Sequence, residues 1–398
     1  AALKMRETAE LQEKLKDEVG LSSTLDSLGS ILKEKNDLEG AEECFGRAME
    51  FKEKQGDTEG VVEIYRNRVT VLLMLGKLDI AEKIIKNSLR ANKKSGNEIG
   101  LMNDYRNMGN LSMQKTDWAN ADKFYKNSLE INNKTNNRYE ISEDHRNRGN
   151  LYLQKEDWSQ AEKFTLKSLA ISEGIKDYRN VCADCRILTN IYVEKKERSK
   201  QEIYYNKALE NSKVLNDPKE ILIDLRYLGK FNMERGYREK AGESFQQAFD
   251  LSSKLNDKKE IAEDYRNLGN LAFSNGERKE AERSYLSALE LTREVGDFKG
   301  AGQDFTYLGN LKFKDYLFEE AENYFSQASE CFENTSSWTS LTQFYLTVAR
   351  MEILVSRYDQ ADEYISKARK VAKDLGDPEP IMKAIQEIEK LKDSVDKK

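Results

Sequence analysis

Small apolar residues return along this chain with a period of forty residues. Alanine occupies one such position in eight of nine successive intervals, from Ala41 to Ala361, and Gln201 fills the ninth. Twelve residues earlier in most intervals lies a glycine, as at Gly109 and Gly269. A fixed period of this length is typical of repeat architectures. The pattern predicts nine repeats in one register, starting at residues 21, 61, 101, 141, 181, 221, 261, 301 and 341.

Each repeat is predicted to be a pair of helices. In residues 261–300, Tyr265 and Leu268 begin one apolar stripe, and Ala281 and Tyr285 begin another, at the three- and four-residue spacings of amphipathic helices. Glycine and asparagine at the breaks supply the left-handed conformation that ends helices. The small residues would let the paired helices approach closely. One hairpin cannot bury its stripe alone, so we expect an all-α solenoid of stacked hairpins.

The two ends of the chain fit the same pattern. Residues 1–20 align with the second helix of a preceding unit, and residues 381–396 predict a single capping helix. We therefore expect residues 1–398 to form a single solenoid. The chain has no initiator methionine and opens within a unit, so we also expect it to be a segment of a longer protein.

The sequence YRNLGNL at residues 265–271 and the sequence EAERSY at residues 280–285 resemble the tetratricopeptide (TPR) signature. The forty-residue period is similar to the variant found in Pins-type spindle-orientation adaptors and related bacterial and archaeal proteins. The resemblance covers essentially the whole chain, although the unit at residues 181–220 departs from it most. It implies a right-handed superhelical solenoid whose first helices line a concave groove, and family members commonly bind extended peptides there.

Polar residues recur in the first helices as regularly as the apolar ones. Arginine returns every forty residues, asparagine follows it four residues later, and aspartate precedes it by two. Packing accounts for a repeated leucine or alanine, but it does not account for repeated arginine and asparagine. The candidate peptide-binding residues are Arg66, Arg106, Asn110, Arg146, Asn150, Arg186, Asn190, Arg226, Lys230, Arg266, Asn270 and Asn310.

Helical geometry assigns different directions to these rows. At 100° per residue, Asn270 lies opposite the buried stripe, Arg266 lies to one side within reach of the groove, and Asp264 lies on the other flank. An aspartate of one repeat can therefore meet an arginine of the next. The rows are either a structural salt-bridge ladder alone, or a ladder whose arginines also bind carboxylates of a ligand.

The asparagine row favours ligand contact. An amide can bind a peptide backbone through both its donor and its acceptor, and no structural task for it is evident on a solvent-facing surface. The arginine row also stops towards both ends, at Asp26, Thr306 and Leu346. A purely structural device should run the full length, so we expect a binding footprint on the second to eighth units.

Two classes of function remain at this stage. The first is a scaffold or adaptor that binds an extended acidic segment of another protein, or of a domain of the same full-length chain, as the regulatory part of a larger protein. The second is an RNA-binding helical-repeat protein, because arginine and asparagine in fixed positions can address one base per repeat. A net charge of −6 and the aspartate row count against nucleic acid as a partner.

Other chemistry finds little support in the sequence. The pair Cys182 and Cys185 has no second pair or ligand histidine near it, so zinc is not expected. His145 is the only histidine and takes an aromatic core position. We predict no enzyme, metal or cofactor, because the chain offers no nucleophile motif or phosphate-binding loop. Trp118 and Trp158 each follow an aspartate that can cap a helix, which predicts a packing role.

Composition agrees with a chain of long helices. Three prolines and 34% charged residues suit a thin stack of helices, and no apolar stretch is long enough to span a membrane. Four cysteines without regular spacing favour a reducing, cytoplasmic setting.

Overall fold

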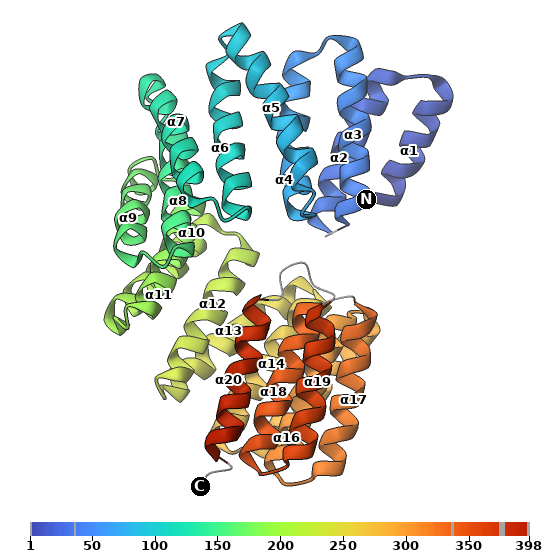
Figure 1. Cartoon of the computed structure of the whole chain (residues 1–398), viewed down its shortest axis with the longest axis vertical. Helices are drawn as coiled ribbons and strands as arrows, with labels where there is room; N and C mark the ends of the chain where they lie inside the picture. Colours follow the sequence, from blue (N-terminus) through green and yellow to red (C-terminus); the bar gives the residue numbers. More distant parts are fainter. Residues whose placement is uncertain (1, 36, 336–337, 374–378, 396–398) are drawn as a thin grey trace. The chain divides into compact units, whose positions relative to one another are not determined.

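The computed structural model describes residues 2–35, 37–335, 338–373 and 379–395, and these form α-helices with no β-strand (Figure 1). The chain divides into two compact units, Ala1–Leu215 and Asn216–Lys398. The first unit contains α1 (Ala2–Leu15), α2 (Glu18–Glu34), α3 (Leu38–Gln55), α4 (Thr58–Met74), α5 (Leu78–Ser95), α6 (Glu98–Gln114), α7 (Trp118–Thr135), α8 (Arg138–Gln154), α9 (Trp158–Gly174), α10 (Tyr178–Glu194) and α11 (Arg198–Leu215). The second unit contains α12 (Pro218–Glu234), α13 (Arg238–Leu255), α14 (Lys258–Asn275), α15 (Arg278–Glu294), α16 (Phe298–Lys314), α17 (Phe318–Asn334), α18 (Trp338–Leu354), α19 (Tyr358–Lys373) and α20 (Glu379–Val395). The continuity of the nine repeats across the two units stays a prediction.

The first helices begin at intervals of forty residues. They start at residues 18, 58, 98, 138 and so on, three residues before the expected starts of the repeats. The shift arises because an N-cap precedes each of these helices up to α16. Asp297, for example, accepts a hydrogen bond from the backbone N–H of Gly300 at 3.0 Å. Caps with such a side-chain bond are Asp17, Asp37, Asp57, Asn97, Asp117, Asn137, Asp157, Asp177, Asp217, Asp257 and Asp297.

Many helices end at a residue in the left-handed conformation. Glycine and asparagine fill this position at several turns, as predicted, with φ of 82° at Gly276 and 53° at Asn256. Thr116 and Tyr316 adopt the same conformation, although their side chains disfavour it. Backbone bonds such as Asp117 N–H to Ser112 C=O, at 2.8 Å, enforce the turn there. The capped helices on either side therefore set the turn geometry, whichever residue fills it.

Helix pairing follows the predicted hairpins within each unit. A first helix packs on the second helix of its own hairpin, and that second helix packs on the next first helix. The predicted close approach at the recurring glycines is confirmed. A Cβ atom at Gly269 would lie 2.6 Å from Cε1 of Tyr285, and one at Gly109 would lie 2.4 Å from Cε1 of Tyr125. Glycine is needed there because the tyrosine ring rests directly on the helix backbone.

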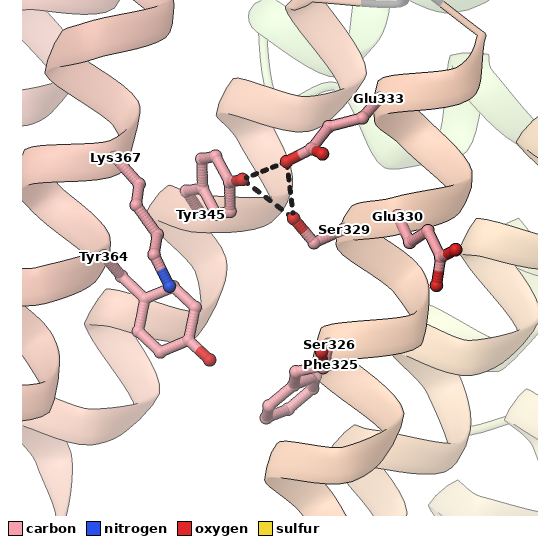
Figure 2. A pocket seen from close by; sticks show the side chains of 8 residues that line it. All are labelled: Phe325, Ser326, Ser329, Glu330, Glu333, Tyr345, Tyr364 and Lys367. Carbon is pink, nitrogen blue, oxygen red and sulfur yellow. Dashed lines mark hydrogen bonds between the residues drawn. The ribbon is translucent and has the colours of Figure 1, made fainter.

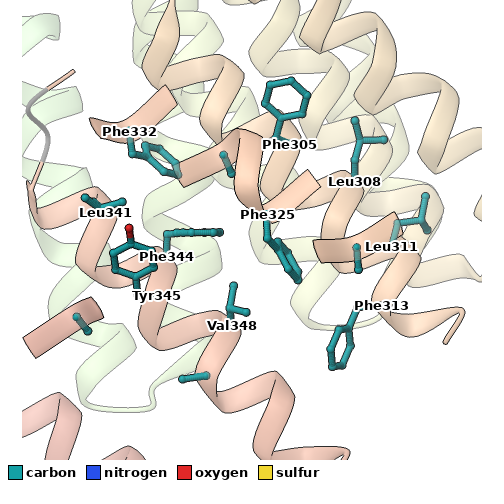
Figure 3. Close-up of a cluster of buried hydrophobic side chains, with 14 of the residues drawn as sticks. Phe305, Leu308, Leu311, Phe313, Phe325, Phe332, Leu341, Phe344, Tyr345 and Val348 are labelled. Carbon is teal, nitrogen blue, oxygen red and sulfur yellow. The ribbon is translucent and has the colours of Figure 1, made fainter. Parts of the chain in front are cut away.

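Aromatic residues fill the core of the second unit. Phe305 of α16, Phe325 of α17 and Phe344 of α18 gather in one buried cluster (Figure 3). Helix α20 packs on α18 and α19 through the buried Ile385 and Ile388, and its role as a capping helix stays a prediction. In the first unit, α1 takes the place of the helix expected at residues 1–20 and packs on α2. None of the helices in the described parts of the chain is long and apolar enough to cross a membrane.

Candidate functional site

Four of the predicted arginines bind the aspartate of the following repeat. Nε of Arg146 on α8 lies 2.7 Å from Oδ1 of Asp184 on α10. The aspartate side chains are fully buried, and the arginine side chains are only 7–16% exposed. The predicted ladder is thus confirmed within each unit, and it runs from the arginine of one repeat to the aspartate of the next. The four pairs are Arg106–Asp144, Arg146–Asp184, Arg226–Asp264 and Arg266–Asp304.

Polar side chains of the intervening second helix also hold three of these aspartates, Asp144, Asp184 and Asp304. Ser128 and Asn132 of α7 donate hydrogen bonds to Asp144 at 2.9 and 2.6 Å. Asp144 on α8 therefore binds α7 and, through Arg106, α6. A buried carboxylate needs such partners, because an unpaired charge in the interior is strongly destabilising. These partners can be recognised in the sequence as hydroxyl or amide residues 16 and 12 positions before the aspartate. The predicted site did not include them.

The charges of each pair reinforce one another. Burial lowers the pKa of the Arg106 guanidinium, but the charges of Asp144 and Glu140 outweigh burial and leave that pKa above its ordinary value. Burial raises the pKa of Asp144, and the charge of Arg106 opposes this rise. The arginine therefore keeps its positive charge in a buried setting.

The outer nitrogen of each ladder arginine binds a glutamate at the solvent boundary. Nη1 of Arg106 donates to Glu140 of the next repeat, and Nη1 of Arg146 donates to Glu143 of its own helix. These side chains are 21–37% exposed, whereas the aspartates are fully buried. Each arginine thus has a buried, fixed side and an outer side. We call Glu140, Glu143, Glu260 and Glu263 the rim glutamates.

The asparagine row has a structural task, which corrects the sequence-based expectation. Oδ1 of Asn110 accepts a hydrogen bond from the Tyr125 hydroxyl at 2.7 Å, and Oδ1 of Asn270 accepts one from Tyr285 at 2.8 Å. Each tyrosine comes from the second helix of the same hairpin. Within the part of the chain that the structure describes, Nδ2 of these two amides donates to no residue. The amide is therefore held by its oxygen, and its donor remains available.

The row is less regular at its other members. Oδ1 of Asn310 is buried and accepts no bond from a described residue, because Phe325 stands where the tyrosines stand in the other hairpins. Asn150 is half-buried, and Asn190 is exposed. Lys230 is also exposed, with Nζ 3.7 Å from Glu263. We call the side of the first helices that bears these residues and Asn110 and Asn270 the first-helix face.

Of the two remaining predicted arginines, Arg66 differs from the ladder. Arg66 is exposed. Asp104 lies 38 positions after it, as in the ladder pairs, but accepts hydrogen bonds from the Tyr65 hydroxyl at 2.8 Å and from Asn92 at 2.7 Å. Arg186 lies half-buried on α10. The ladder geometry is therefore established for Arg106, Arg146, Arg226 and Arg266 and not for Arg66.

The side chains set aside on sequence grounds occupy packing positions. His145 stacks on Phe164 with centroids 6.1 Å apart, and burial lowers the pKa of the imidazole to about 4. Cys182 and Cys185 are fully buried, and the Cys182 thiol donates to the backbone C=O of Ala208. Trp118 and Trp158 begin α7 and α9 behind the caps Asp117 and Asp157, as predicted. No group of three or more metal-ligating side chains occurs among the described residues.

Comparisons with known proteins agree with this architecture. Residues 229–375 match the soluble NSF attachment protein (SNAP) family model, and residues 23–55 match a tetratricopeptide repeat model. Aspartyl phosphate phosphatase F from Bacillus subtilis has a similar fold, with a TM-score of 0.56, 15% identity, and coverage of 88% of this chain and 93% of that one. The apo quorum sensor NprR from B. thuringiensis gives a TM-score of 0.54 at 14% identity, covering 91% and 99%. Apo RapI gives 0.51 at 14% identity, covering 69% and 99%.

No curated protein sequence matches the chain. The repeat period, the paired helices and these matches together define the class. The chain is a tetratricopeptide-type helical-repeat protein.

Proposed function

We propose that this protein is a scaffold that binds an extended peptide segment on the first-helix face, and that it is not an enzyme. The observation that carries the proposal is the pair of amides at Asn110 and Asn270. Each is fixed by a tyrosine hydroxyl and keeps a free N–H donor. A preoriented amide donor loses little conformational entropy on binding a peptide carbonyl. The same arrangement occurs in each unit, so each unit can offer such a contact by itself.

The preference for acidic segments rests on the outer nitrogens of the ladder arginines. The rim glutamates occupy these nitrogens in the free protein, and they are partly exposed. A carboxylate from a ligand offers the same charge-assisted bond, so it can replace the rim glutamate while the buried aspartate stays in place. We propose two roles for the ladder arginines: each holds the buried aspartate and also binds a carboxylate of the ligand. These arginines are Arg106, Arg146, Arg226 and Arg266. Arg66, Arg186, Asn150, Asn190, Lys230 and Asn310 extend the proposed binding face.

Proteins with this fold have different roles, so fold likeness alone does not select one. NprR is named as a quorum sensor, and phosphatase F is named as an aspartyl phosphate phosphatase. In the present chain the only histidine is stacked in the hairpin and neutral, which supports binding without catalysis. We place this binding in the cytoplasm, where the four cysteines would stay reduced. The partner is another protein, or a domain of the same full-length chain.

Hydrogen exchange on the whole chain tests the location of the site. A short glutamate-rich peptide, added in excess, should slow amide exchange in α6, α8, α14 and α16. A lysine-rich peptide of the same length should leave those helices unchanged. Protection confined to the second helices would contradict the proposed face.

A further inference from the structure

A cavity of about 250 Å³ opens in the second unit. It lies among α17, α18 and α19 (Figure 2). Phe325 and Tyr345 form buried walls, and Tyr364 and Lys367 close it from α19. A cavity of this size is below the range for drug-sized ligands, but it can accommodate the end of one long side chain.

Hydroxyl groups orient a carboxylate at this cavity. The Tyr345 and Ser329 hydroxyls lie 2.8 Å apart, and each donates to Oε1 of Glu333 at 3.3 Å. The second oxygen, Oε2, accepts no hydrogen bond from any residue in the described ranges. The Glu333 carboxylate is thus fixed through Oε1, and its Oε2 can accept a hydrogen bond from a ligand.

Aromatic rings supply the second element of a cation site. The Tyr345 and Tyr364 rings lie 6.1 Å apart at 43°. Nζ of Lys367 lies 4.9 Å from the centre of the Tyr364 ring and also binds Glu363. The chain's own ammonium therefore already uses this ring face, which shows that the ring is placed to attract a cation.

The helix that carries Glu333 has an unbalanced charge. Helix α17 contains five glutamates and no lysine or arginine. Glu320 and Glu322 bind Lys312 and Arg357. Glu319, Glu330 and Glu333 form no ion pair with a residue that the structure describes. This surplus continues beyond the cavity, which favours a ligand with more than one positive charge.

We propose that this cavity binds the ammonium or guanidinium group of a lysine or arginine in a basic peptide segment. The group would bond Oε2 of Glu333 and contact the tyrosine rings, while neighbouring basic residues meet the other glutamates of α17. This site has different lining residues from the first-helix face and the opposite charge preference. It gives the protein a second docking surface, and the proposal stands or falls independently of the acidic-peptide site.

Fluorescence anisotropy with the full chain tests the proposal. The probe is a short labelled peptide of lysine, glycine and serine, and the control probe is the same peptide with acetylated lysines, which carry no charge. Glu333→Gln should weaken binding of the lysine peptide about tenfold. Lys367→Met should strengthen it, because the ring face of Tyr364 becomes free and a competing charge is lost. Thermal unfolding confirms that each variant folds.

Glu290→Gln on α15 is the matched control, since Glu290 is an exposed glutamate of the second unit outside the cavity. If Glu333→Gln behaves like Glu290→Gln, or if Lys367→Met weakens binding, the assignment is overturned. Equal binding of the acetylated peptide overturns it too. If free lysine competes as well as the peptide does, the cavity is a small-amine site and the peptide assignment is wrong.

Discussion

Arg146 on α8 and Asp184 on α10 are 38 positions apart, yet they form an ion pair with a separation of 2.7 Å between Nε and Oδ1. The same spacing recurs in the other three pairs of the ladder. Each pair joins two consecutive first helices, and the aspartate also binds the second helix between them at Asp144, Asp184 and Asp304. The ladder thus fixes successive hairpins on each other.

Asp184→Asn should lower the free energy of unfolding by about 3–5 kcal/mol, because Arg146 would lose its buried counter-charge and keep only the partly exposed Glu143. The control is Glu13→Gln. Its pair with Arg47 is 39–60% exposed, so the loss should stay below about 1 kcal/mol. Urea unfolding measures both values, and hydrogen exchange should place the effect in α8, α9 and α10. Equal losses for the two variants would count against a structural ladder.

Phe325→Tyr should stabilise the protein by about 0.5–1.5 kcal/mol. The Phe325 ring lies against Gly309 as the Tyr285 ring lies against Gly269, and the added hydroxyl would reach the unpartnered Oδ1 of Asn310. Thermal and urea unfolding measure the gain.

Phe245→Tyr is the matched control for this substitution. Phe245 packs on Gly229 in the same manner, but Lys230 stands in the asparagine position and offers no acceptor. No gain is expected there. A similar gain at both sites would show that the hydroxyl acts without the asparagine.

Stability should fall between about pH 4.5 and 7 because of Glu352. The Glu352 carboxyl is fully buried beside Arg357, and the Arg357 guanidinium also binds Glu322. Burial raises the pKa of Glu352 to about 7. The pKa of Glu352 is higher in the folded state than in the unfolded state. Its contribution to the free energy of unfolding is therefore fully present below the unfolded-state pKa and is lost as pH rises through the folded-state pKa. Glu352→Gln should remove this part of the pH dependence in a series of thermal unfolding curves. An unchanged pH profile in the variant would refute the assignment.

The rim glutamates should compete with an acidic ligand. Glu143→Gln combined with Glu263→Gln weakens the hold on Nη1 of Arg146 and Arg266, so a glutamate-rich peptide should bind several-fold more tightly. Glu130→Gln with Glu290→Gln changes the net charge equally at exposed sites on second helices. Isothermal titration compares the two double variants. An equal gain in affinity in the control double variant would show that the change in net charge alone causes the effect.

The architecture could be predicted from the sequence because its period is strict and local. Helix pairs, the glycine contacts at Gly269 and the pairing of arginine with aspartate all follow from spacing alone. The tyrosine bond to Asn270 was missed, since it joins residues 15 positions apart on two helices whose relative orientation the helical wheel does not give. The rim glutamates were missed for a related reason. Their position at the solvent boundary depends on burial, which the repeat pattern does not encode.

The most direct test of the proposed site is the affinity for a glutamate-rich peptide of a variant that carries Asn110→Leu and Asn270→Leu. One substitution lies in each unit. Asn206→Leu with Asn323→Leu removes exposed amides from second helices of the same two units and serves as control. We expect the Asn110 and Asn270 double variant to raise the Kd at least about tenfold, and the control pair to leave it unchanged. An unchanged Kd in the folded Asn110 and Asn270 double variant would contradict peptide binding on the first-helix face.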